Sequence, residues 1–592
     1  MKLNLDFYKE QEETLTAQEE EIIKIINENN KEDYYKIMQE NVNLDVILAL
    51  SKNRQNILDW YPFGKEAAIL EICPNFGELT EVLCKNASRV VSIENSLKKA
   101  SAIKKRYEDV QNLEVIVGSL ENIDINEKFD YITLVGTLEN INSVSNCKLD
   151  DFINLLKKYL KENGTILIAV DNKLGMKYFS KTDNTGISVT NSTYKKLYTL
   201  EDILRVIEKF DLKYKKVYYP MPDYKLTNAI FSDDKLLSKD NLSRNIVYNS
   251  EDTIKFYEEN PIYRDIIQEE SNTFKMFANS YLVEISNCDI KTKNIRFVSF
   301  SNMRKPEYKI KTIMEDEYVY KYSGNSCSKK HLDNIKKNIE IIKKSNLKTV
   351  DSYDEEKIIS KYVNAHTLDK VIVDLVKASK KDEAINLMKL FGEELLQKLE
   401  KSEDKSCENV FDKYNVEYEK KDIKNMTFIK NGLWDLVFQN CFYINGEFYF
   451  YDQEWIEENL PFEFIIYRAI KYFTRIKKYI SDEELFEVLD ISKDKIRLFD
   501  KLDDKIQEKI RNEIMWNLHT KGTYVLNLRV NEEKLNNKII MLENKIENKD
   551  NEIKILKEQI ENLKNELTGI YDSRAWKITE PLRKIGENMR KK

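Results

Sequence analysis

The stretch GLWDLVFQNCFYINGEFYFYDQEW (432–455) decides how the middle of the chain is interpreted. Asp435 is followed five residues later by Asn440, and Asp452 comes 17 residues after Asp435. Two apolar runs flank Asn445-Gly446, a dipeptide that is typical of a two-residue hairpin turn. The sequence therefore predicts a loop and a short β-hairpin that carry two acids and an amide.

The elements upstream of this stretch are predicted to be strands and one helix. NIRFVSFS, YKIKTIM and EYVYKYS begin near residue 293 and favour an antiparallel meander, and KIISKYV favours a further strand. Between them, 330–344 is a charged helical stretch. Lys321 lies in the third strand, and Glu340 follows 19 residues later on the helix, at a plausible distance for an ion pair.

In this order, the elements of about 291–520 resemble the protein-kinase-like and aminoglycoside-phosphotransferase-like fold. The resemblance implies that Lys321 contacts the α- and β-phosphates of ATP with Glu340 as its partner, and that ISKYVNAHTL is the hinge that holds the adenine. It also implies that Asp435 orients and deprotonates an acceptor hydroxyl.

The same resemblance implies that Asn440 and Asp452 coordinate Mg²⁺. Two features depart from the pattern of the family. SFSNMRKPEY stands where a glycine-rich loop is expected, and Leu433-Trp434 stand where His-Arg or His-Gly usually precede the catalytic Asp.

Length and composition predict a multidomain α/β protein of the cytoplasm. The chain has 592 residues, 42% hydrophobic and 33% charged, which is more than one core would need. A net charge of −7 gives no global electrostatic argument for nucleic-acid binding. Seven Cys without a CxxC pair and three His argue against structural zinc and favour a reducing compartment. The start lacks the apolar core of a signal peptide, and no segment has the ~18 apolar residues of a membrane span.

The N-terminal part is predicted to be a parallel, helix-flanked sheet preceded by helices over 1–60. The apolar runs AAILEI, RVVSIE, LEVIVGS, FDYITLVG and GTILIAV alternate with polar helical stretches between 67 and 170. FKMFANSYLVEIS (274–286) is predicted to be a late strand that closes the same sheet.

Three acids follow the strands of this sheet. Glu71 ends the first strand, and a turn that contains Gly77 leads into a helix. Glu94 ends the next strand 23 residues later, about where nucleotide-type folds place an acid that accepts hydrogen bonds from ribose hydroxyls. Glu121 follows the third strand.

The stretch of about 45–290 resembles the class I S-adenosylmethionine (SAM)-dependent methyltransferases. The resemblance implies that SAM is bound by Glu71, Asn75, Gly77 and Glu94, with Glu121 near the adenine. Cys73 and Asn75 replace the first two glycines of the family loop, and Cys tolerates a positive φ poorly. The loop either binds the cofactor in an altered geometry, or this domain persists as a scaffold.

Two blocks resemble segments of methyltransferases from bacterial surface-glycan loci. They are DNKLGMKYFSKTDNTG (171–186) and YYPMPDYKLTNAIFSD (218–233), and they could line an acceptor site. In the alternative interpretation, their aromatic residues Tyr178, Phe179, Tyr218 and Tyr219 belong to the core.

The last section carries a heptad seam that Lys549 interrupts once, which predicts a coiled coil and hence a homo-oligomer. The alternative is an intramolecular helical hairpin. The seam consists of Leu535, Ile539, Leu542, Ile546, Ile553, Leu556, Ile560, Leu563, Leu567 and Ile570.

The predicted fold class is thus a Rossmann-like methyltransferase sheet, a central kinase-like α+β domain and a C-terminal coiled coil. The predicted domains are a helical extension (1–60), a methyltransferase-like domain (61–290), a kinase-like domain (291–525), the coiled coil (526–570) and a basic amphipathic tail (571–592).

This order resembles the bifunctional kinase–methyltransferases that terminate O-antigen chains. The resemblance implies phosphorylation and methylation of a bacterial surface or flagellar glycan, with SAM, ATP and Mg²⁺, and a glycosyltransferase as a partner. The alternatives are a single-activity methyltransferase and a non-catalytic scaffold that recruits glycosyltransferases through its coiled coil.

The tail YDSRAWKITEPLRKI (571–585) resembles a short tail of surface-polysaccharide glycosyltransferases. Its alternating apolar and basic residues, with Arg590, Lys591 and Lys592, favour a peripheral contact with the inner face of the cell membrane. A frayed helical end is the alternative.

Overall fold

The computed structural model describes residues 1–592 except 11, 41, 142–144, 146, 183–196, 249–253, 256–257, 268–271, 403–408, 521–522 and 591–592. The chain divides into two compact units, residues 1–522 and 523–592.

The first half of the 1–522 unit is built on a parallel sheet in the order β1-β4-β3-β2-β5-β6. Its inner strands are almost fully buried and apolar, as expected for a parallel sheet that is covered on both faces. The strands are β1 (Lys2–Asn4), β2 (Ala68–Ile72), β3 (Arg89–Glu94), β4 (Leu113–Val117), β5 (Phe129–Val135) and β6 (Leu160–Asp171).

The predicted late strand is present and reverses the direction of the sheet. β11 (Ser280–Ser286) lies between β6 and β8 (Tyr214–Met221) and is antiparallel to both. β1 corrects the prediction that residues 1–60 are purely helical, because Lys2–Asn4 pairs with β4 at the edge of the sheet.

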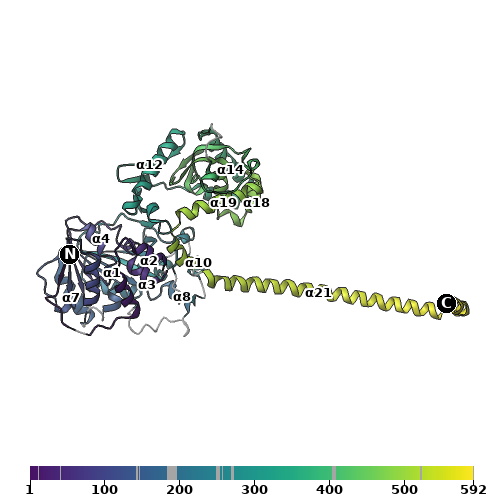
Figure 1. The fold of residues 1–592 in the computed structure, drawn as a ribbon, viewed down its shortest axis with the longest axis horizontal. Helices are drawn as coiled ribbons and strands as arrows, with labels where there is room; N and C mark the ends of the chain where they lie inside the picture. The colour runs from purple at the N-terminus through teal and green to yellow at the C-terminus, as the bar shows by residue number, and fades with distance from the viewer. Residues whose placement is uncertain are drawn as a thin grey trace. The chain divides into compact units, whose positions relative to one another are not determined.

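Helices cover this sheet, and α1, α4 and α7 are drawn around it in Figure 1. Their ends follow local signals: the Ser96 side chain caps α5, and Thr199 and Asp202 form a capping box for α9. The helices are α1 (Ala17–Glu28), α2 (Tyr34–Glu40), α3 (Leu44–Leu50), α4 (Thr80–Asn86), α5 (Leu97–Arg106), α7 (Leu149–Tyr159), α8 (Met176–Ser180), α9 (Leu200–Glu208), α10 (Glu259–Ile266) and α11 (Thr273–Phe277).

The sheet does not stop at the predicted boundary between residues 290 and 291. β9 (Ala229–Ser232) pairs with β8 on one side and with β12 (Phe297–Phe300) on the other. One 14-stranded sheet therefore runs from the first half into the second.

The second half continues the sheet in the order β12-β13-β14-β17-β16, all antiparallel, and α12 (Lys329–Lys344) packs beside it. The predicted strands of the meander are present, and β16 is a strand that was not predicted. The bounds are β13 (Ile310–Met314), β14 (Tyr318–Ser323), β16 (Asp351–Tyr353) and β17 (Lys357–Lys361).

A mostly helical lobe follows, and Figure 1 shows α14, α18 and α19 gathered in it. The predicted hairpin is present, and its turn residues Asn445 and Gly446 both have positive φ (52° and 83°). The elements are α13 (Leu368–Lys377), α14 (Lys381–Lys398), α15 (Val410–Lys413), α16 (Lys420–Ile423), β15 (Lys348–Thr349), β18 (Phe428–Leu433), β19 (Cys441–Ile444), β20 (Glu447–Phe450), β21 (Ile456–Pro461), α17 (Phe462–Lys471), α18 (Asp482–Val488), α19 (Lys493–Ile510) and α20 (Glu513–Thr520).

α20 returns the chain to the first half. Its buried residues Ile514, Met515 and Leu518 join one apolar cluster with Ile22 and Ile26 of α1. The two halves of this unit are therefore joined both by a continuous sheet and by a helix.

The 523–592 unit contains one helix of 50 residues, α21 (Thr523–Asp572), followed by α22 (Arg574–Ile578) and α23 (Glu580–Arg590). Because α21 is unbroken, the alternative prediction that the seam folds back as a helical hairpin is wrong. Its described seam side chains from Ile539 to Ile570 are 46–62% exposed, while the side chains of Leu535, Arg590, Lys591 and Lys592 lie outside the described residues. In the described part of the chain, no helix is long and apolar enough to cross a membrane.

Two candidate ligand sites

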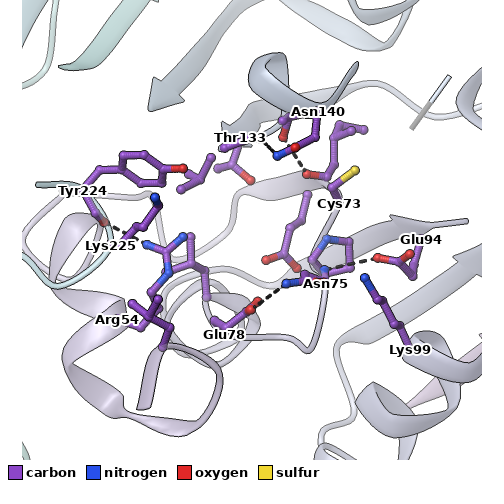
Figure 2. Close-up of a pocket in the computed structure, with 18 of the residues that line it drawn as sticks. Arg54, Cys73, Asn75, Glu78, Glu94, Lys99, Thr133, Asn140, Tyr224 and Lys225 are labelled. Carbon is purple, nitrogen blue, oxygen red and sulfur yellow. Dashed lines mark hydrogen bonds between the residues drawn. The ribbon is translucent and has the colours of Figure 1, made fainter. Parts of the chain in front are cut away.

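The first candidate site is a cavity of about 400 Å³ at the carboxyl ends of β2, β3 and β5. Ligands of open α/β sheets bind at this edge. Four acidic and three basic side chains line the cavity, so it suits a ligand that carries both charges. Figure 2 shows the loop after β2 in its wall, with Glu94 and Lys99 on one side and Arg54, Tyr224 and Lys225 on the other.

The loop after β2 keeps the backbone of a glycine loop although two of its glycines are replaced. Cys73, Asn75 and Gly77 all have positive φ, at 60°, 55° and 76°. A Cβ on Gly77 would lie 2.7 Å from the Tyr107 ring, whose hydroxyl donates to the Gly77 carbonyl at 2.6 Å. The substitutions at Cys73 and Asn75 thus change the residues of the loop and leave its course intact, at a strain of roughly 1–3 kcal/mol for each non-glycine residue.

Glu94 holds the loop from the neighbouring strand. Its carboxylate accepts the backbone N–H groups of Asn75 at 3.2 Å and Ser96 at 3.0 Å. Burial raises the pKa of Glu94 to about 7, against the opposing hydrogen bond from Ser96 and the nearby Lys99. Lys99 itself pairs with Glu19 at 2.6 Å. Glu94 therefore faces the cavity as an acceptor, as the sequence predicts.

Glu71 lines the same cavity from the end of β2. Thr80 and Ser92 donate their hydroxyls to it at 2.8 and 2.7 Å, and burial raises its pKa to about 7. Glu78, which the sequence analysis missed, also lines the cavity and accepts from the Asn75 amide at 3.0 Å. The signal that could have found it is an acid one residue after the loop glycine.

The predicted place of Glu121 at the cofactor is corrected, because Glu121 is not among the described residues that line this cavity. It lies in a 3₁₀ turn (Leu120–Asn122) beyond β4 and accepts the hydroxyl of Ser145 at 2.8 Å. Gly77 is also absent from the lining, and its part is conformational. The 3₁₀ turn after β4 directs the Glu121 side chain to Ser145.

Three lining residues come from elements that were not assigned to the site. Arg54 lies in a 3₁₀ helix (Lys52–Ile57), and its guanidinium donates to the Tyr224 carbonyl at 2.8 Å. Tyr224 and Lys225 follow β8. Tyr224 and Lys225 are more than 140 positions from the loop, so the folded sheet brings them there, whereas Arg54 lies only 19 positions before Cys73.

A smaller cavity of about 240 Å³ adjoins the first, and Leu48 and Lys225 line both. A buried charge network forms its wall. Lys177 pairs with Asp171 and, at 3.0 Å, with Asp223, and Lys225 pairs with Asp171 at 3.0 Å. Although burial alone would raise it, the two ammonium groups hold the pKa of Asp171 well below its ordinary value.

The aromatic residues of the two glycan-type blocks separate in the structure. Tyr178 lines the adjoining cavity, and its hydroxyl donates to Asp171 at 3.3 Å. Tyr218 and Tyr219 are buried core residues, and Phe179 is partly exposed beside Phe277. Positions 183–186 of the first block lie outside the described residues.

The second candidate site is a cavity of about 370 Å³ between strands β12–β14 and the hairpin β19–β20. Lys321 projects into it from β14 and pairs with Asp452 and, at 2.6 Å, with Glu454. The predicted hinge lines it through Tyr362 and Val363. The structure thus brings together Lys321, Asp452 and the hinge.

The predicted ion pair between Lys321 and Glu340 is corrected as well, because Glu340 does not reach Lys321. It is exposed and pairs with Lys343 at 3.1 Å. On α12, the residue that faces the site is His331, whose Nε2 lies 3.6 Å from Glu454. Nine residues separate His331 from Glu340, and at about 100° per residue they point to opposite sides of the helix. Glu454 takes the place predicted for Glu340.

Both departures from the kinase-like pattern have a structural counterpart. In the loop that replaces the glycine-rich segment, Arg304 pairs with Glu454. Trp434, next to Asp435, stacks on Trp455 at 5.4 Å, and the Arg468 guanidinium lies 4.2 Å from its ring centroid. Two arginine side chains and a pair of stacked tryptophans therefore pack around the predicted catalytic loop.

Asp435 is nearly buried, and its carboxylate lies 3.9 Å from the Arg468 guanidinium. Burial raises the pKa of Asp435 to about 6, while Arg468 opposes this effect. Its carbonyl accepts from the amides of Asn440 at 3.2 Å and Gln453 at 2.9 Å, which fixes the loop to the hairpin. Among the described side chains that line the cavity, Asp452 is present, whereas Asp435 and Asn440 are not.

Asn440 and Asp452 lie at the open end of the hairpin, because Cys441 pairs with Phe450. Both side chains offer oxygen atoms, the ligands that Mg²⁺ prefers. The Asn440 amide nitrogen donates to the Asp435 carbonyl, and the Asp452 carboxylate is also paired with Lys321. Within the described residues, no group of three or more His, Cys, Asp or Glu is placed to hold a metal. The pair fits Mg²⁺ only with further oxygens from a ligand or water.

The comparisons with known proteins concern the part of the chain that forms the first cavity. Residues 70–168 match the family described as "Methyltransferase domain". Over 172 residues, the chain is 26% identical to a malonyl-[acyl-carrier protein] O-methyltransferase of Priestia megaterium, which is 28% of this chain and 61% of that protein. The chain thus spans less than two thirds of the curated relative that it matches.

Solved structures give low overall similarity. A possible histamine N-methyltransferase of Thermotoga maritima is 13% identical, with a TM-score of 0.26 over 46% of this chain and 100% of that one. A phosphoethanolamine N-methyltransferase of Haemonchus contortus is 10% identical, with a TM-score of 0.26 over 47% and 51%. The family match and the sheet order together place a class I SAM-dependent methyltransferase domain in the first half of the chain.

Proposed function

We propose that this protein is a bifunctional transferase that methylates and phosphorylates a bacterial surface or flagellar glycan. SAM would occupy the first cavity, and ATP with Mg²⁺ would occupy the cavity beside Lys321. The observation that carries the methyl-transfer part is the pair of adjoining cavities that share Leu48 and Lys225.

The residues of the first cavity fit SAM at both of its ends. Glu94 would accept hydrogen bonds from the ribose hydroxyls, and Arg54 and Lys225 would hold the carboxylate of the amino-acid part. When bound, SAM supplies a methyl group on a positively charged sulfur. The protein's contribution is to hold an acceptor in line with that group, which is mainly a matter of positioning.

The adjoining cavity would hold the acceptor. Its lining mixes the polar groups of Tyr178, Asn279 and Glu259 with Lys225, which is shared with the cofactor cavity. Hydroxyl, amide and carboxylate groups are suitable partners for the hydroxyls of a sugar. A glycan end is therefore the proposed acceptor class.

For phosphoryl transfer, Lys321 would bind phosphate oxygens and Asp435 would take the proton of the acceptor hydroxyl. The new bond between the acceptor oxygen and phosphorus would form as the bond from the terminal phosphorus of ATP to its bridging oxygen breaks and ADP leaves. The raised pKa of Asp435, about 6, suits a group that accepts a proton near neutral pH. Asn440 and Asp452 would hold Mg²⁺, which neutralises phosphate charge when bound.

Calorimetry of the full chain with SAM and with Mg·ATP tests both parts. Glu94→Gln should weaken SAM binding alone, and Asp435→Asn should abolish phosphate transfer while SAM binding remains. A glycan acceptor, isolated from the source cell, should gain both phosphate and methyl by mass spectrometry. Absence of binding of either ligand would contradict the proposal.

A single-activity methyltransferase, or a scaffold, is the alternative that the misplaced Glu340 and the missing glycine-rich loop favour. A chain that ends at residue 522 separates an enzyme from a scaffold. An enzyme should keep its turnover on a soluble acceptor, whereas a scaffold should lose its function with the seam of α21.

We also propose that α21 forms a homo-oligomeric coiled coil, because its seam side chains are exposed in the described chain. Replacing Leu556 and Ile560 with Asp should convert the oligomer to a monomer in sedimentation, while Glu558→Gln should not. The proposed contacts with a glycosyltransferase and with the membrane rest on α21 and on Ile578, Leu582 and Ile585 of the tail, which are 59–75% exposed.

A further inference from the structure

A segment of the methyltransferase half reaches into the second cavity. Residues 233–245 follow β9, and their side chains Lys235, Asn241 and Arg244 line the same cavity as Lys321 and Asp452. These residues precede the kinase-like part by more than 45 positions, and no motif in the sequence connects them with it. The cavity is therefore composite.

The segment is fastened on both sides of the cavity. Because β9 pairs with β12, the chain leaves the sheet directly beside the cavity. Lys235 Nζ lies 3.3 Å from the Met314 sulfur on β13. On the helical lobe, Asp240 pairs with Arg475 and, at 2.8 Å, with Lys370. The segment thus spans from the strands to the helical lobe and fixes its cations in the cavity.

The charge of the cavity is unbalanced. Five basic side chains line it against two acidic ones. The two acids, Asp452 and Glu454, are already paired with Lys321 and Arg304. In the described part of the chain, no carboxylate forms an ion pair with Lys235 or Arg244. Cations without a counterion in a pocket indicate an anionic ligand.

Lys235 shows the effect of this imbalance. Burial, followed by the positive charges of Arg296, Arg244 and Lys370, lowers the pKa of Lys235 to about 8. An anion bound beside it would reverse this shift. Arg244 lies in the same cavity, open to solvent, where a phosphate could reach its planar fork of donors.

We propose that Lys235 and Arg244 bind the phosphate groups of the ligand in this cavity, so that the methyltransferase half completes the phosphoryl-transfer site. The proposal rests on the proposed phosphotransferase function. The two cations would do what backbone N–H groups of a glycine-rich loop do elsewhere, namely neutralise and orient phosphates. The ligand is a nucleoside polyphosphate or the phosphate of a phosphorylated sugar, and these share the chemistry.

The test measures binding to the full chain by calorimetry with Mg·ATP, inorganic tripolyphosphate and mannose 6-phosphate. The double variant Lys235→Gln/Arg244→Gln should bind the responding ligand at least about tenfold more weakly than the native chain. Arg244→Lys should recover part of the affinity. The control Lys239→Gln, an exposed position of the same segment, should bind like the native chain, and SAM binding should be unchanged in all variants.

The three probes identify the source of the phosphate. A response to ATP and tripolyphosphate indicates the nucleotide, and a response to mannose 6-phosphate alone indicates the acceptor. If the double variant binds as tightly as the native chain, the inference is wrong and the proposed function stands. If the native chain binds none of the three, both are wrong.

A measurement on the native chain removes dependence on the variants. At pH 8, an N-hydroxysuccinimide acetate reagent should acetylate Lys235 readily, and the responding ligand should slow that reaction at least about fivefold by mass spectrometry. Lys239 should react equally with and without ligand. Equal rates at Lys235 would overturn the inference.

Discussion

The cavities of the two candidate sites in the 1–522 unit differ in what they retain from the sequence patterns that predict them. The first retains a backbone and changes its residues: Cys73 and Asn75 adopt the positive φ of glycines. The second retains Lys321 and Asp452 in its lining and changes the partner of Lys321, with Glu454 in place of Glu340. Loop shape is set by strand ends and by Glu94, whereas an ion pair can be supplied from any element that reaches the same point.

The largest expected effect is that of a substitution at Asp435 on phosphoryl transfer. We expect Asp435→Asn to lower phosphoryl transfer by about 10³-fold, because the amide cannot take the acceptor proton. SAM binding should be unchanged. The measurement is phosphate incorporation into a glycan acceptor by mass spectrometry, with Asp494→Asn, an exposed acid, as the control. Full activity of Asp435→Asn would contradict the assigned role.

Glu454 and Glu340 test the exchange of partners. Glu454→Gln leaves Lys321 and Arg304 with less counter-charge in a buried site, and we expect a loss of about 3 kcal/mol in the free energy of unfolding. Glu340→Gln should cause no measurable change. Denaturant titration of both variants decides this, and equal effects would mean that α12 is rotated from the described position.

Glu94 tests the first cavity, and Glu121→Gln is its matched control. Glu94→Gln should weaken SAM binding by about 10–100-fold in calorimetry, because a charge-assisted acceptor is lost. Glu121→Gln should leave the affinity unchanged, since Glu121 lies outside the cavity. A loss of affinity in Glu121→Gln would contradict the correction made for that residue.

The pH dependence of SAM binding follows from the same group. With a pKa of about 7 in the ligand-free protein, Glu94 is protonated below that pH and accepts poorly. Affinity should therefore fall as the pH drops from 8 to 6, and the fall should be smaller in Glu94→Gln. Folding has the opposite sign: because the folded pKa is raised, the contribution of Glu94 to stability is present below about 4.5 and lost as the pH rises through 7.

The smallest effect concerns the substituted loop itself. Cys73→Gly should relieve the strain of a positive φ while increasing the freedom of the unfolded chain, so we expect between no change and about 1 kcal/mol more stability. Cys73→Ala keeps the Cβ and should not stabilise. Thermal unfolding of the two variants provides the comparison, and a Gly variant less stable than the Ala variant would contradict the strain.

Local patterns in the sequence were sufficient for the elements and for contacts between neighbours in the chain. The hairpin at Asn445-Gly446, the strands of both halves and the position of Glu94 at a strand end follow from turn chemistry and apolar periodicity. Glu121 and Glu340 were placed wrongly for a related reason. Glu121 was predicted from its place after a strand and Glu340 from a spacing along the chain, but a turn after β4 and half a helical turn in α12 point these side chains elsewhere.

The remaining site residues lie too far away in the sequence for such arguments. Lys225 enters the first cavity because β8 belongs to the same sheet as β2, and Glu454 meets Lys321 although 133 positions separate them in the chain. Lys235 and Arg244 do so because β9 pairs with β12, a contact that crosses the predicted domain boundary.

The sequence by itself determined most of the elements, since apolar spacing, turn dipeptides and caps act within a few residues, although it did not predict the short edge strands β1 and β16. It also determined the order of two domain patterns and the apolar seam of the last section. Only the tertiary structure decided that one sheet joins the two halves, that Glu454 meets Lys321, and that a segment of the first half places two cations in the second cavity. These outcomes depend on strand pairing and charge burial between residues far apart in the chain, and no local pattern encodes such distances.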